Sequence, residues 1–341
     1  MKAAVVRTFG QPLTIEELPL REPKENEIVV KTIASGVCHS DVHTANGEWP
    51  LKPKMPLVMG HEGLGYVAAT GPNVKNVKEG DIVGVPWLYN ACGHCEFCTS
   101  GWEPLCMTQE NSGYTLDGGH AEYIVADARY VARFPEKKFD PYEMAPILCA
   151  GVTVYKGLKM ADVQPGEWIA ISGIGGLGHL AVQYAKVMGY NVAAIDVTDE
   201  KLDLAKRVGA DITINSSKQD AAAFLQKELG GVHGMAVTAV AVPAFDHAIG
   251  AVRRGSTVSV IGIPVGNMSF SIFDIVLNAI TVRGSVIGTR QEMQEAIDFA
   301  VEGKVKTTIH KAKMEDINEI LDKLKHGKIE GRMVLNISDP V

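Results

Sequence analysis

The chain has 341 residues, of which 46% are hydrophobic, enough for two domains of ordinary size with buried cores. Acidic residues outnumber basic ones by 40 to 33, and the resulting net charge of -7 argues against binding to nucleic acid or to an acidic membrane surface. Met1–Gly10 does not resemble a signal or transit peptide. The most apolar later stretch, 235–252, contains Pro243 and Asp246, so it falls short of the ~20 apolar residues of a membrane span. We therefore expect a cytoplasmic protein with small-molecule chemistry and with neither a nucleic acid nor a membrane partner.

The first 150 residues have the pattern of a β-rich domain. Short apolar runs, separated by turn residues, predict strands at Lys2–Arg7, Glu27–Ala34, Gly65–Ala69 and Asp81–Val85.

From about Gly151 to Val286 the pattern changes to apolar strands that alternate with amphipathic helices. Strands are predicted at Trp168–Ile171 and Val192–Ile195, and helices at Gly178–Met188 and Asp199–Val208. This βαβ alternation indicates a parallel sheet, and the fold class is α/β.

The last stretch contains a predicted helix, Glu315–Lys325, and a predicted strand, Arg332–Ile337. We assign 1–150 and 287–341 to one domain and 151–286 to the other. The sequence alone leaves open whether the final strand returns to the first domain or extends the second.

A glycine-rich turn, Gly173-Ile174-Gly175-Gly176-Leu177-Gly178, follows the first predicted strand of the α/β region and opens its helix. In a dinucleotide site these glycines allow a tight turn, close approach of a pyrophosphate, and helix–strand packing. The next strand ends in Asp196, whose carboxylate would accept hydrogen bonds from ribose hydroxyls and repel a 2′-phosphate. NAD is thus favoured over NADP. The alternative to a cofactor site is that the glycines form a tight turn in some other doubly wound protein.

Four cysteines lie close together in the sequence with the spacing C-x2-C-x2-C-x7-C: Cys92, Cys95, Cys98 and Cys106. The spacing suits a closed tetrahedral zinc site, which stabilises a loop and has no open position for catalysis. An iron–sulfur cluster is the alternative, but the bacterial ferredoxin run has three residues before its fourth cysteine and a proline after it.

Cys38, His61 and Cys149 form a second possible ligand set, although they are far apart in sequence. Two thiolates and an imidazole leave zinc a fourth position for water or substrate. Taken singly, Cys149 could be a small buried hydrophobe and His61 an ordinary loop histidine.

These motifs together resemble the zinc-containing medium-chain alcohol dehydrogenases, in particular their yeast-like and bacterial branch. The family signature G-H-E-x2-G-x5-G-x2-V is matched by Gly60, His61, Glu62, Gly65, Gly71 and Val74. The run Cys-His-Ser-Asp-x-His from Cys38, the cysteine-rich segment and the glycine turn occur in the family's order over nearly the whole chain. The resemblance implies a GroES-like β-rich catalytic domain, a Rossmann doubly wound parallel-sheet domain, and a homotetramer.

The resemblance also implies two zinc ions per chain, a structural one on the four clustered cysteines and a catalytic one on Cys38, His61 and Cys149. Glu62 would lie just behind the catalytic zinc, and Asp41 would orient His61.

For proton transfer, the resemblance implies that Ser40 accepts the alcohol proton and passes it, through the nicotinamide ribose, to His43. His39 would lie beside the pyrophosphate.

Other cofactor contacts follow from the same resemblance. Thr153 and Leu177 would flank the nicotinamide, and backbone groups near Ile261, Ser285 and Ile287 would hold its carboxamide. Lys201 would reach the adenosine ribose and Arg332 the pyrophosphate, the alternative for both being solvated surface charges.

The expected activity is NAD-dependent, reversible oxidation of small primary alcohols to aldehydes. Zinc makes the alkoxide accessible near neutral pH, and a hydride passes to the nicotinamide. Trp49 and Trp87 would narrow the substrate pocket, unless they are ordinary core aromatics. The alternatives are a secondary-alcohol, polyol or threonine dehydrogenase of the same family, or a zinc- and NAD-binding protein without turnover.

Overall fold

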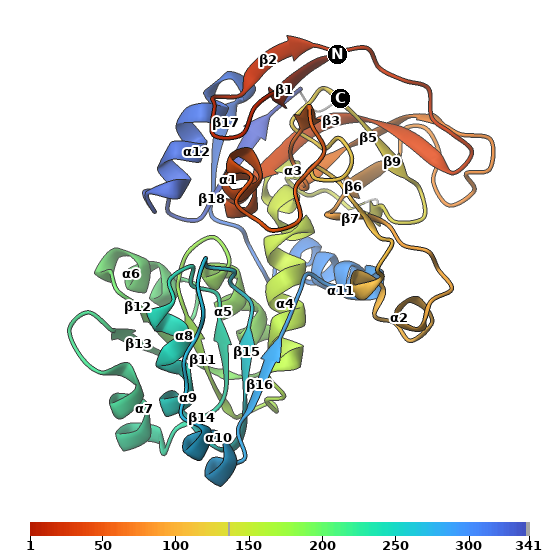
Figure 1. Cartoon of the computed structure of the whole chain (residues 1–341). Coiled ribbons are helices and arrows are strands. Elements are labelled where there is room, and N and C mark those ends of the chain that lie inside the picture. The colour runs from red at the N-terminus through yellow and green to blue at the C-terminus, as the bar shows by residue number, and fades with distance from the viewer. Residues whose placement is uncertain (136, 339–341) are drawn as a thin grey trace. The chain divides into compact units, whose positions relative to one another are not determined.

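The computed structural model describes residues 1–135 and 137–338 and divides the chain into two compact units (Figure 1). Unit 1 comprises Met1–Cys149, Thr289–Val301 and the described part of Thr307–Val341, and unit 2 comprises Ala150–Gly288 and Glu302–Lys306.

The main difference from the division expected from the sequence is the short segment Glu302–Lys306, which groups with unit 2. The reason is a pair of hydrogen bonds to Gln183. Its side-chain amide donates to the Lys306 carbonyl at 2.9 Å, and its Oε1 accepts from the Lys306 N–H at 2.8 Å. Sequence periodicity gives no signal for such a contact.

Unit 1 is built mainly of antiparallel strands. Within the described residues its largest sheet has seven strands in the order β10-β6-β5-β3-β18-β17, with β9 also paired to β3. The strands of the unit are β1 (Lys2–Val6), β2 (Thr14–Glu17), β3 (Glu27–Val37), β4 (Leu57–Val58), β5 (Gly63–Thr70), β6 (Ile82–Val85), β7 (Leu88–Asn90), β8 (Glu110–Asn111), β9 (Tyr123–Asp127), β10 (Ala132–Arg133), β17 (Ile309–Lys313) and β18 (Arg332–Asn336). Its helices are α1 (His39–Asn46), α2 (Glu96–Thr99), α3 (Pro141–Met144), α11 (Arg290–Val301) and α12 (Ile317–Lys325), with 3-10 turns η1 (Glu103–Leu105), η2 (Ala145–Leu148) and η3 (Met314–Asp316).

Strand β3 connects the two apolar cores of this sheet. Ile28 and Val30 pack into one core, and Val37 packs into the other with Met59 and Leu335. Because β3 is buried along most of its length, its sequence is a nearly continuous apolar run. The strand ends at Val37, directly before the first predicted zinc ligand.

The C-terminal strand returns to unit 1. Strand β18 pairs antiparallel with β3, with Leu335 opposite Ser35, which settles the question that the sequence left open. The helix predicted from Glu315 begins instead at Ile317, because the preceding residues form the turn η3, where the Asp316 carboxylate accepts from the Lys313 N–H at 3.0 Å.

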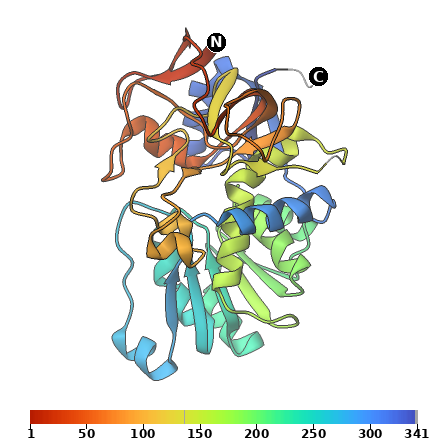
Figure 2. The same ribbon diagram turned by 90° about the vertical axis from the view of Figure 1, so that its right-hand side faces the viewer.

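Unit 2 is a doubly wound parallel sheet with the strand order β13-β12-β11-β14-β15-β16 (Figure 2). Its strands are β11 (Trp168–Ser172), β12 (Asn191–Asp196), β13 (Ile212–Asn215), β14 (Val232–Val237), β15 (Val252–Val260) and β16 (Thr281–Gly284). Its helices are α4 (Ala150–Met160), α5 (Gly178–Val187), α6 (Asp199–Arg207), α7 (Ala221–Leu229), α8 (Pro243–Asp246), α9 (Ala248–Ala251) and α10 (Ile272–Asn278). The strands and helices predicted between 168 and 208 are confirmed to within one or two residues.

The strand order places a topological switch point at β11, whose neighbours are β12 on one side and β14 on the other. The crossover from β11 through α5 to β12 and the crossover from β13 through α7 to β14 run in opposite directions along the sheet, so right-handed connections put α5 and α7 on opposite faces. Ligands of open α/β sheets bind at the carboxyl ends of the strands beside such a point. The loop after β11 is the glycine turn.

Throughout residues 1–135 and 137–338, we find no helix both long enough and apolar enough to cross a membrane. The apolar stretch 235–252 is divided among the end of β14, the short helices α8 and α9, and the start of β15.

Candidate active site and metal centres

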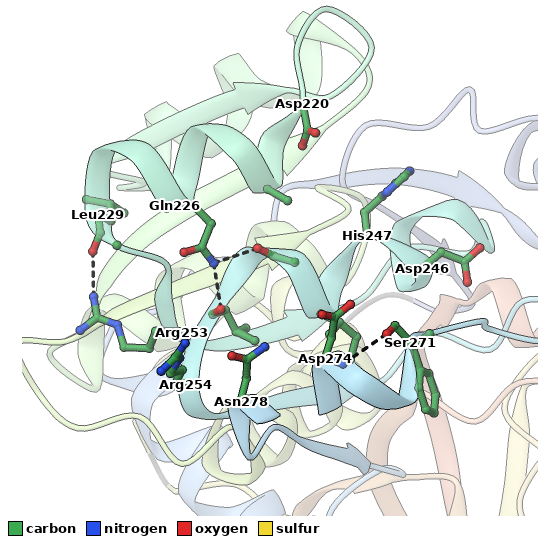
Figure 3. Close-up of a pocket in the computed structure, with 16 residues that line it drawn as sticks. Asp220, Gln226, Leu229, Asp246, His247, Arg253, Arg254, Ser271, Asp274 and Asn278 are labelled. Atoms are coloured by element: carbon green, nitrogen blue, oxygen red, sulfur yellow. Dashed lines mark hydrogen bonds between the residues drawn. The ribbon is translucent and has the colours of Figure 1, made fainter. Parts of the chain in front are cut away.

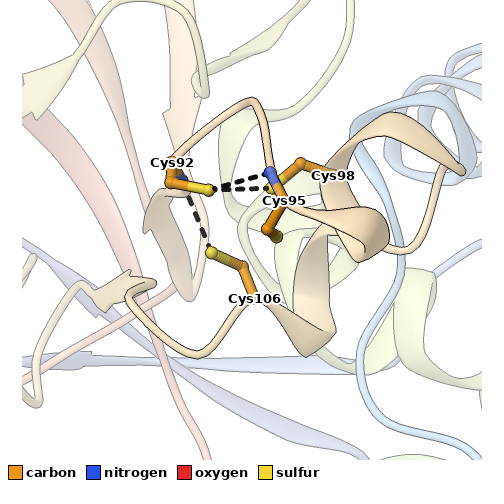
Figure 4. Close-up of side chains that lie close together, drawn as sticks. All are labelled: Cys92, Cys95, Cys98 and Cys106. Carbon is orange, nitrogen blue, oxygen red and sulfur yellow. Dashed lines mark hydrogen bonds between the residues drawn. The ribbon is translucent and has the colours of Figure 1, made fainter.

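The four clustered cysteines converge in unit 1 (Figure 4). Their sulfur atoms lie within 4.8 Å of one another, and Cys92 Sγ is 3.9 Å from Cys98 Sγ, far beyond disulfide length. Four sulfurs bound tetrahedrally at about 2.3 Å from zinc would be roughly 3.8 Å apart. The cluster therefore has the dimensions of a tetrahedral thiolate zinc site.

Backbone N–H groups favour thiolates in this cluster. The Cys95 N–H donates to Cys92 Sγ at 3.3 Å, and the Cys92 N–H donates to Cys106 Sγ at 3.4 Å. Burial raises the pKa of Cys106, but the donors from Cys92 and Thr108 outweigh it and lower that pKa to about 6. The thiolate is the form that binds metal.

A second cluster brings together Cys38, His61, Glu62 and Cys149, all buried, with one ligand atom of each within 4.8 Å of the others. Cys38 follows β3, His61 and Glu62 lie between β4 and β5, and Cys149 follows η2. The two sulfurs are 3.9 Å apart. His61 Nε2 is buried without a hydrogen-bond partner in the described part of the chain. A buried ring nitrogen without a partner, beside two thiols, is what a zinc site lacking its ion would show.

Asp41 lies behind His61, in the position that the resemblance implies. Its buried carboxylate places Oδ1 3.5 Å from His61 Nδ1, and Oδ2 accepts from the Cys38 N–H at 2.8 Å. Burial would raise the pKa of Asp41, but His61 and His120 hold it well below its usual range. The contact with Nδ1 leaves His61 Nε2 for the metal.

Sequence reasoning missed His120. This fully buried side chain places Nε2 3.6 Å from Asp41 Oδ2, and its Nδ1 is 2.9 Å from Ser35 Oγ. His120 lies in a loop without periodicity, and nothing in its sequence neighbourhood marks it as part of the site.

Glu62 forms a buried ion pair with Arg332, which is only 3% exposed and also donates to the Val37 carbonyl at 3.2 Å. Burial raises the pKa of Glu62 to about 7, against the opposing attraction of Arg332. The alternative of a solvated surface charge is therefore wrong for Arg332. Its contact with a pyrophosphate remains a prediction.

The predicted proton-transfer residues lie on α1. Ser40 Oγ is 3.7 Å from Cys38 Sγ. One turn further along, His43 Nδ1 is 2.5 Å from Glu48 Oε2, and the His43 ring lies 5.2 Å from the ring of His39. Ser40 is thus beside the metal ligands, and Nε2 of His43 is the nitrogen not engaged by Glu48.

Aromatic rings line the region next to His61. The Trp87 ring meets the His61 ring edge-on at 5.3 Å and lies 6.2 Å from Trp49, which stacks on His43 at 5.5 Å. Tyr114, which sequence reasoning missed, lies 5.3 Å from Trp87 and 5.7 Å from Trp49. The structure therefore brings both tryptophans together beside the second cluster.

In the glycine turn of unit 2, packing requires glycine at positions 173 and 178 but not at position 175. A Cβ on Gly178 would lie 1.9 Å from the Gly173 carbonyl oxygen, and one on Gly173, whose φ is +95°, would lie 2.7 Å from the Ala239 nitrogen. A Cβ on Gly175 would meet nothing within 4 Å. Packing of the protein does not require glycine at 175, so the open space there fits the close approach of a pyrophosphate. Gly176 and Leu177 complete the turn and are half-buried.

Asp196 ends β12 beside this turn. Its Oδ2 accepts from the Ile174 N–H and its Oδ1 from the Val197 N–H, both at 2.7 Å. Oδ1 also accepts from the Thr198 N–H at 3.2 Å, whereas Oδ2 keeps a second lone pair for a ribose hydroxyl. Lys201 Nζ is 4.0 Å from Asp196 Oδ1, so this cation is near the predicted ribose site and is more than a solvated charge.

The residues predicted to hold the nicotinamide also lie in unit 2. Thr153 is buried in α4. Ile261 follows the carboxyl end of β15, and Ser285 follows the carboxyl end of β16. The Ser285 hydroxyl is buried and has no hydrogen-bond partner in the described residues. Ile287 has a positive φ of +34°, which is unusual for a β-branched residue. Their contacts with the nicotinamide remain predictions.

A separate pocket of about 1020 Å³ lies in unit 2 at the amino end of β15 (Figure 3). Its polar lining is largely paired within the protein: Gln226 donates to the carbonyls of Gly250 and Val252, and Arg253 to that of Leu229. None of the predicted site residues is among the residues that line it.

Comparison with known proteins agrees with this geometry. Residues 24–136 match the family model of the alcohol dehydrogenase GroES-like domain, and residues 176–302 match that of the zinc-binding dehydrogenases. An alcohol dehydrogenase of Moraxella sp. (strain TAE123) is 56% identical over 98% of this chain and 99% of its own length. The crystal structure of the alcohol dehydrogenase of the hyperthermophilic archaeon Aeropyrum pernix has a TM-score of 0.91 and 32% identity, covering 98% of this chain and 100% of that one. Acetophenone reductase of Geotrichum candidum, solved in complex with NAD, has a TM-score of 0.88 and 32% identity, covering 100% of this chain and 98% of that one.

The fold and the two ligand clusters define a two-domain zinc-binding oxidoreductase. The chain belongs to the zinc-containing medium-chain alcohol dehydrogenases, the family that its sequence motifs resemble. The alcohol dehydrogenase activity and the cofactors zinc and NAD expected from the sequence are thereby confirmed.

The separation of the two metal clusters gives a first prediction. Changing Cys98 to Ser should remove one of two zinc ions per chain and lower the melting temperature, because a thiolate that closes a structural site is lost. Changing Cys38 to Ser should remove the other zinc ion and abolish turnover while the fold is kept. Elemental analysis combined with thermal unfolding measures both effects. One zinc ion in the parent protein, or turnover by the Cys38→Ser variant, would contradict the assignment.

The carboxylate of Asp196 gives a second prediction. Changing Asp196 to Gly should raise the ratio of kcat/KM with NADP to kcat/KM with NAD by about tenfold or more, since an acceptor for ribose hydroxyls and a repulsive charge are lost together; tenfold corresponds to ~1.4 kcal/mol. Asp196→Asn is the matched variant, because it keeps the shape and one acceptor while it removes the charge and replaces the other acceptor oxygen by an amide donor. Its ratio should be intermediate. An unchanged ratio in both variants would show that Asp196 supports only the glycine turn.

Proposed function

We propose that this dehydrogenase oxidises small primary alcohols reversibly to aldehydes, with Cys38, His61 and Cys149 holding the catalytic zinc. The main support for this proposal is that two thiols and the His61 Nε2, which has no hydrogen-bond partner in the described residues, converge beside the ring of Trp87. When bound, zinc supplies a Lewis acid that lowers the pKa of the alcohol, and NAD supplies the hydride acceptor.

The residues of α1 would then move the proton. Ser40 Oγ lies beside Cys38 Sγ and accepts the alcohol proton. His43 receives it at Nε2, because its Nδ1 is engaged by Glu48. The contact with the Glu48 carboxylate fixes the orientation of the ring, which favours His43 as the outer end of the path.

Glu62 and Arg332 would serve the metal and the cofactor together. Glu62 Oε2 is buried without a hydrogen-bond partner in the described residues, although its other oxygen pairs with Arg332. A carboxylate oxygen so placed is available to the metal while ligands exchange. Arg332 Nε is likewise buried without a partner, which leaves a donor for a pyrophosphate oxygen.

In unit 2, the cofactor would occupy the turn from Gly173 to Gly178. The open space at Gly175 admits the pyrophosphate, and Asp196 with Lys201 holds the adenosine ribose. Ser285 offers an unpartnered hydroxyl at the carboxyl end of the sheet, where the resemblance places the nicotinamide.

The substrate class rests on the aromatic rings of Trp49, Trp87 and Tyr114, whose centroids lie 5.3 to 6.2 Å apart. Trp87 lies against His61, and Trp49 and Tyr114 pack against Trp87, an arrangement that favours a narrow apolar space and hence short unbranched alcohols. A secondary-alcohol, polyol or threonine dehydrogenase would need room for a branch or for further polar groups. A scan of alcohols with NAD and NADP separates these activities, and a lack of turnover with all of them would favour a non-catalytic role.

Trp87 gives the sharpest test of this substrate class. Changing it to Ala removes a ring of the size that buries ~200 Å² and opens the space next to His61. The kcat/KM for benzyl alcohol should rise relative to that for ethanol by about tenfold, or ~1.4 kcal/mol, since the clash with a bulky group is relieved in the transition state. Leu51→Ala, at an exposed position, controls for a general effect of truncation. If ethanol, 1-butanol and benzyl alcohol change by one common factor, Trp87 is a core residue.

We also propose that the chain forms a homotetramer, and one face of unit 2 supports self-association. None of the residues of α10 is buried, and its apolar side chains Ile272, Phe273, Val276 and Leu277 are at least 60% exposed. The neighbouring strand β16 is at the edge of the sheet. An apolar face beside an open sheet edge is typical of an interface between subunits. This face would serve one of the contacts that a tetramer requires.

A charged substitution on this face tests the proposal. Phe273→Glu should lower the molar mass in solution, measured by light scattering, to half or a quarter of the parent value, because the charge would be buried in the contact. Leu51→Glu is the control at an exposed apolar position of unit 1. An unchanged mass in the Phe273→Glu variant would place the contact elsewhere.

The cytoplasmic location remains part of this proposal. The six cysteines are free in the structure, as the reducing conditions of the cytoplasm require of metal-binding thiolates.

A further inference from the structure

His120 is a buried polar side chain that the proposed chemistry does not use. It has no exposed surface, and its two ring nitrogens face two buried polar groups of unit 1. Nδ1 lies 2.9 Å from Ser35 Oγ, and Nε2 lies 3.6 Å from Asp41 Oδ2. Among the described residues Nε2 has no hydrogen-bond partner, so Asp41 is the acceptor that its environment offers.

The backbone of His120 is fixed to the loop that carries His61. The His120 N–H donates to the Met59 carbonyl at 2.9 Å, and the Gly119 N–H donates to the Gly60 carbonyl at 2.8 Å. A Cβ on Gly60, whose φ is +98°, would lie 2.6 Å from His120 Nδ1. The imidazole therefore packs directly against the residue that precedes the metal ligand.

The surrounding groups assign a direction to the hydrogen bonds. The Ser35 hydroxyl can donate to Nδ1, which places the ring proton on Nε2, facing Asp41. Asp41 then accepts one hydrogen bond, from the Cys38 N–H to Oδ2 at 2.8 Å, and faces a ring N–H on each side: His61 Nδ1 lies 3.5 Å from Oδ1, and His120 Nε2 lies 3.6 Å from Oδ2. The 3.6 Å separation exceeds an N–H···O bond of about 2.9 Å by roughly 0.7 Å, a distance that a small rotation of either side chain closes.

We propose that His120, oriented by Ser35, is a positioning residue for the catalytic zinc, because it holds the Asp41 carboxylate that orients His61. The inference rests on the proposed zinc site of Cys38, His61 and Cys149. It adds a third layer to that site: metal ligand, carboxylate, and the histidine that fixes the carboxylate.

The physical reason is the burial of Asp41. A buried carboxylate keeps one orientation only where donors saturate its oxygens. Without His120, Oδ2 would keep only the Cys38 N–H, and the carboxylate could rotate away from His61 Nδ1. Groups that orient a metal-bound histidine typically change metal affinity by 10–100-fold when they are lost. One layer further out, we expect a smaller effect.

Two substitutions of similar chemistry separate positioning from simple packing. His120→Gln extends an amide to the position of Nε2 and keeps a donor for Asp41. His120→Asn places its amide near the position of Nδ1 and keeps a partner only for Ser35. Both variants are polar and smaller than histidine, so both lose packing.

The measurement is the rate at which the holoenzyme releases zinc to an excess of a colorimetric chelator, with thermal unfolding followed in parallel. The structural zinc of the Cys92 cluster is the internal reference, identified by its rate in the Cys38→Ser variant. We expect His120→Asn to release the catalytic zinc about 3- to 10-fold faster than the parent, below the 10–100-fold range expected for Asp41→Asn. His120→Gln should remain within about twofold of the parent, and the structural zinc should be released at the parent rate in both.

Equal release by the Asn and Gln variants, or the parent rate in the Asn variant, would overturn the positioning role. If His120→Asn does not fold, Ser35→Ala provides the test, because it removes the donor to Nδ1 and should accelerate release by about 2- to 3-fold, whereas the parent rate would overturn the proposal. A parent protein with only one zinc ion per chain would instead contradict the proposed catalytic site itself.

Discussion

The structure of unit 1 depends on the burial of charge next to the second cysteine cluster. Asp41 and Glu62 are carboxylates without exposed surface, and the thiols of Cys38 and Cys149 lie within 4.8 Å of a carboxylate oxygen of Glu62. Arg332 beside Glu62 compensates part of this negative charge, and a cation held by the two thiolates would compensate more of it. Since an unpaired buried charge costs several kcal/mol, the surrounding strands must bring groups of opposite charge close to these carboxylates. Strand β3 ends at Val37, directly before Cys38, and β18 begins at Arg332, and the antiparallel pairing of these strands holds the two ends together.

Much of this architecture could be predicted from the sequence, because the chemistry depends on short motifs. The glycine turn, the four-cysteine spacing and the run from Cys38 each retain their residues within a few positions, and periodicity indicated the strands and helices around them. The return of β18 could not be derived, because antiparallel pairing with β3 leaves no local signal in either strand.

The residues that the sequence did not reveal act across long separations. His120 and Tyr114 lie in irregular segments between β8 and β9, where neither spacing nor alternation marks them. Gln183 resembles any polar residue of an amphipathic helix, although it binds the backbone of Lys306. The burial of Arg332 was also hidden, because a cation at the start of a strand is exposed in most proteins. In each case the partner is more than 60 residues away or belongs to another element.

The position of β18 in the sheet also bears on how the chain is made. In the seven-stranded sheet of the described residues, β18 lies between β3 and β17, although it is translated after all of unit 2. Until β18 has emerged from the ribosome, the edge of β3 next to Cys38 stays unpaired, and Glu62 lacks its guanidinium. Unit 2, whose sheet is complete in one continuous stretch from β11 to β16, can fold during translation. The order of synthesis therefore postpones assembly of the ion pair beside the cysteine cluster until unit 2 has been synthesised.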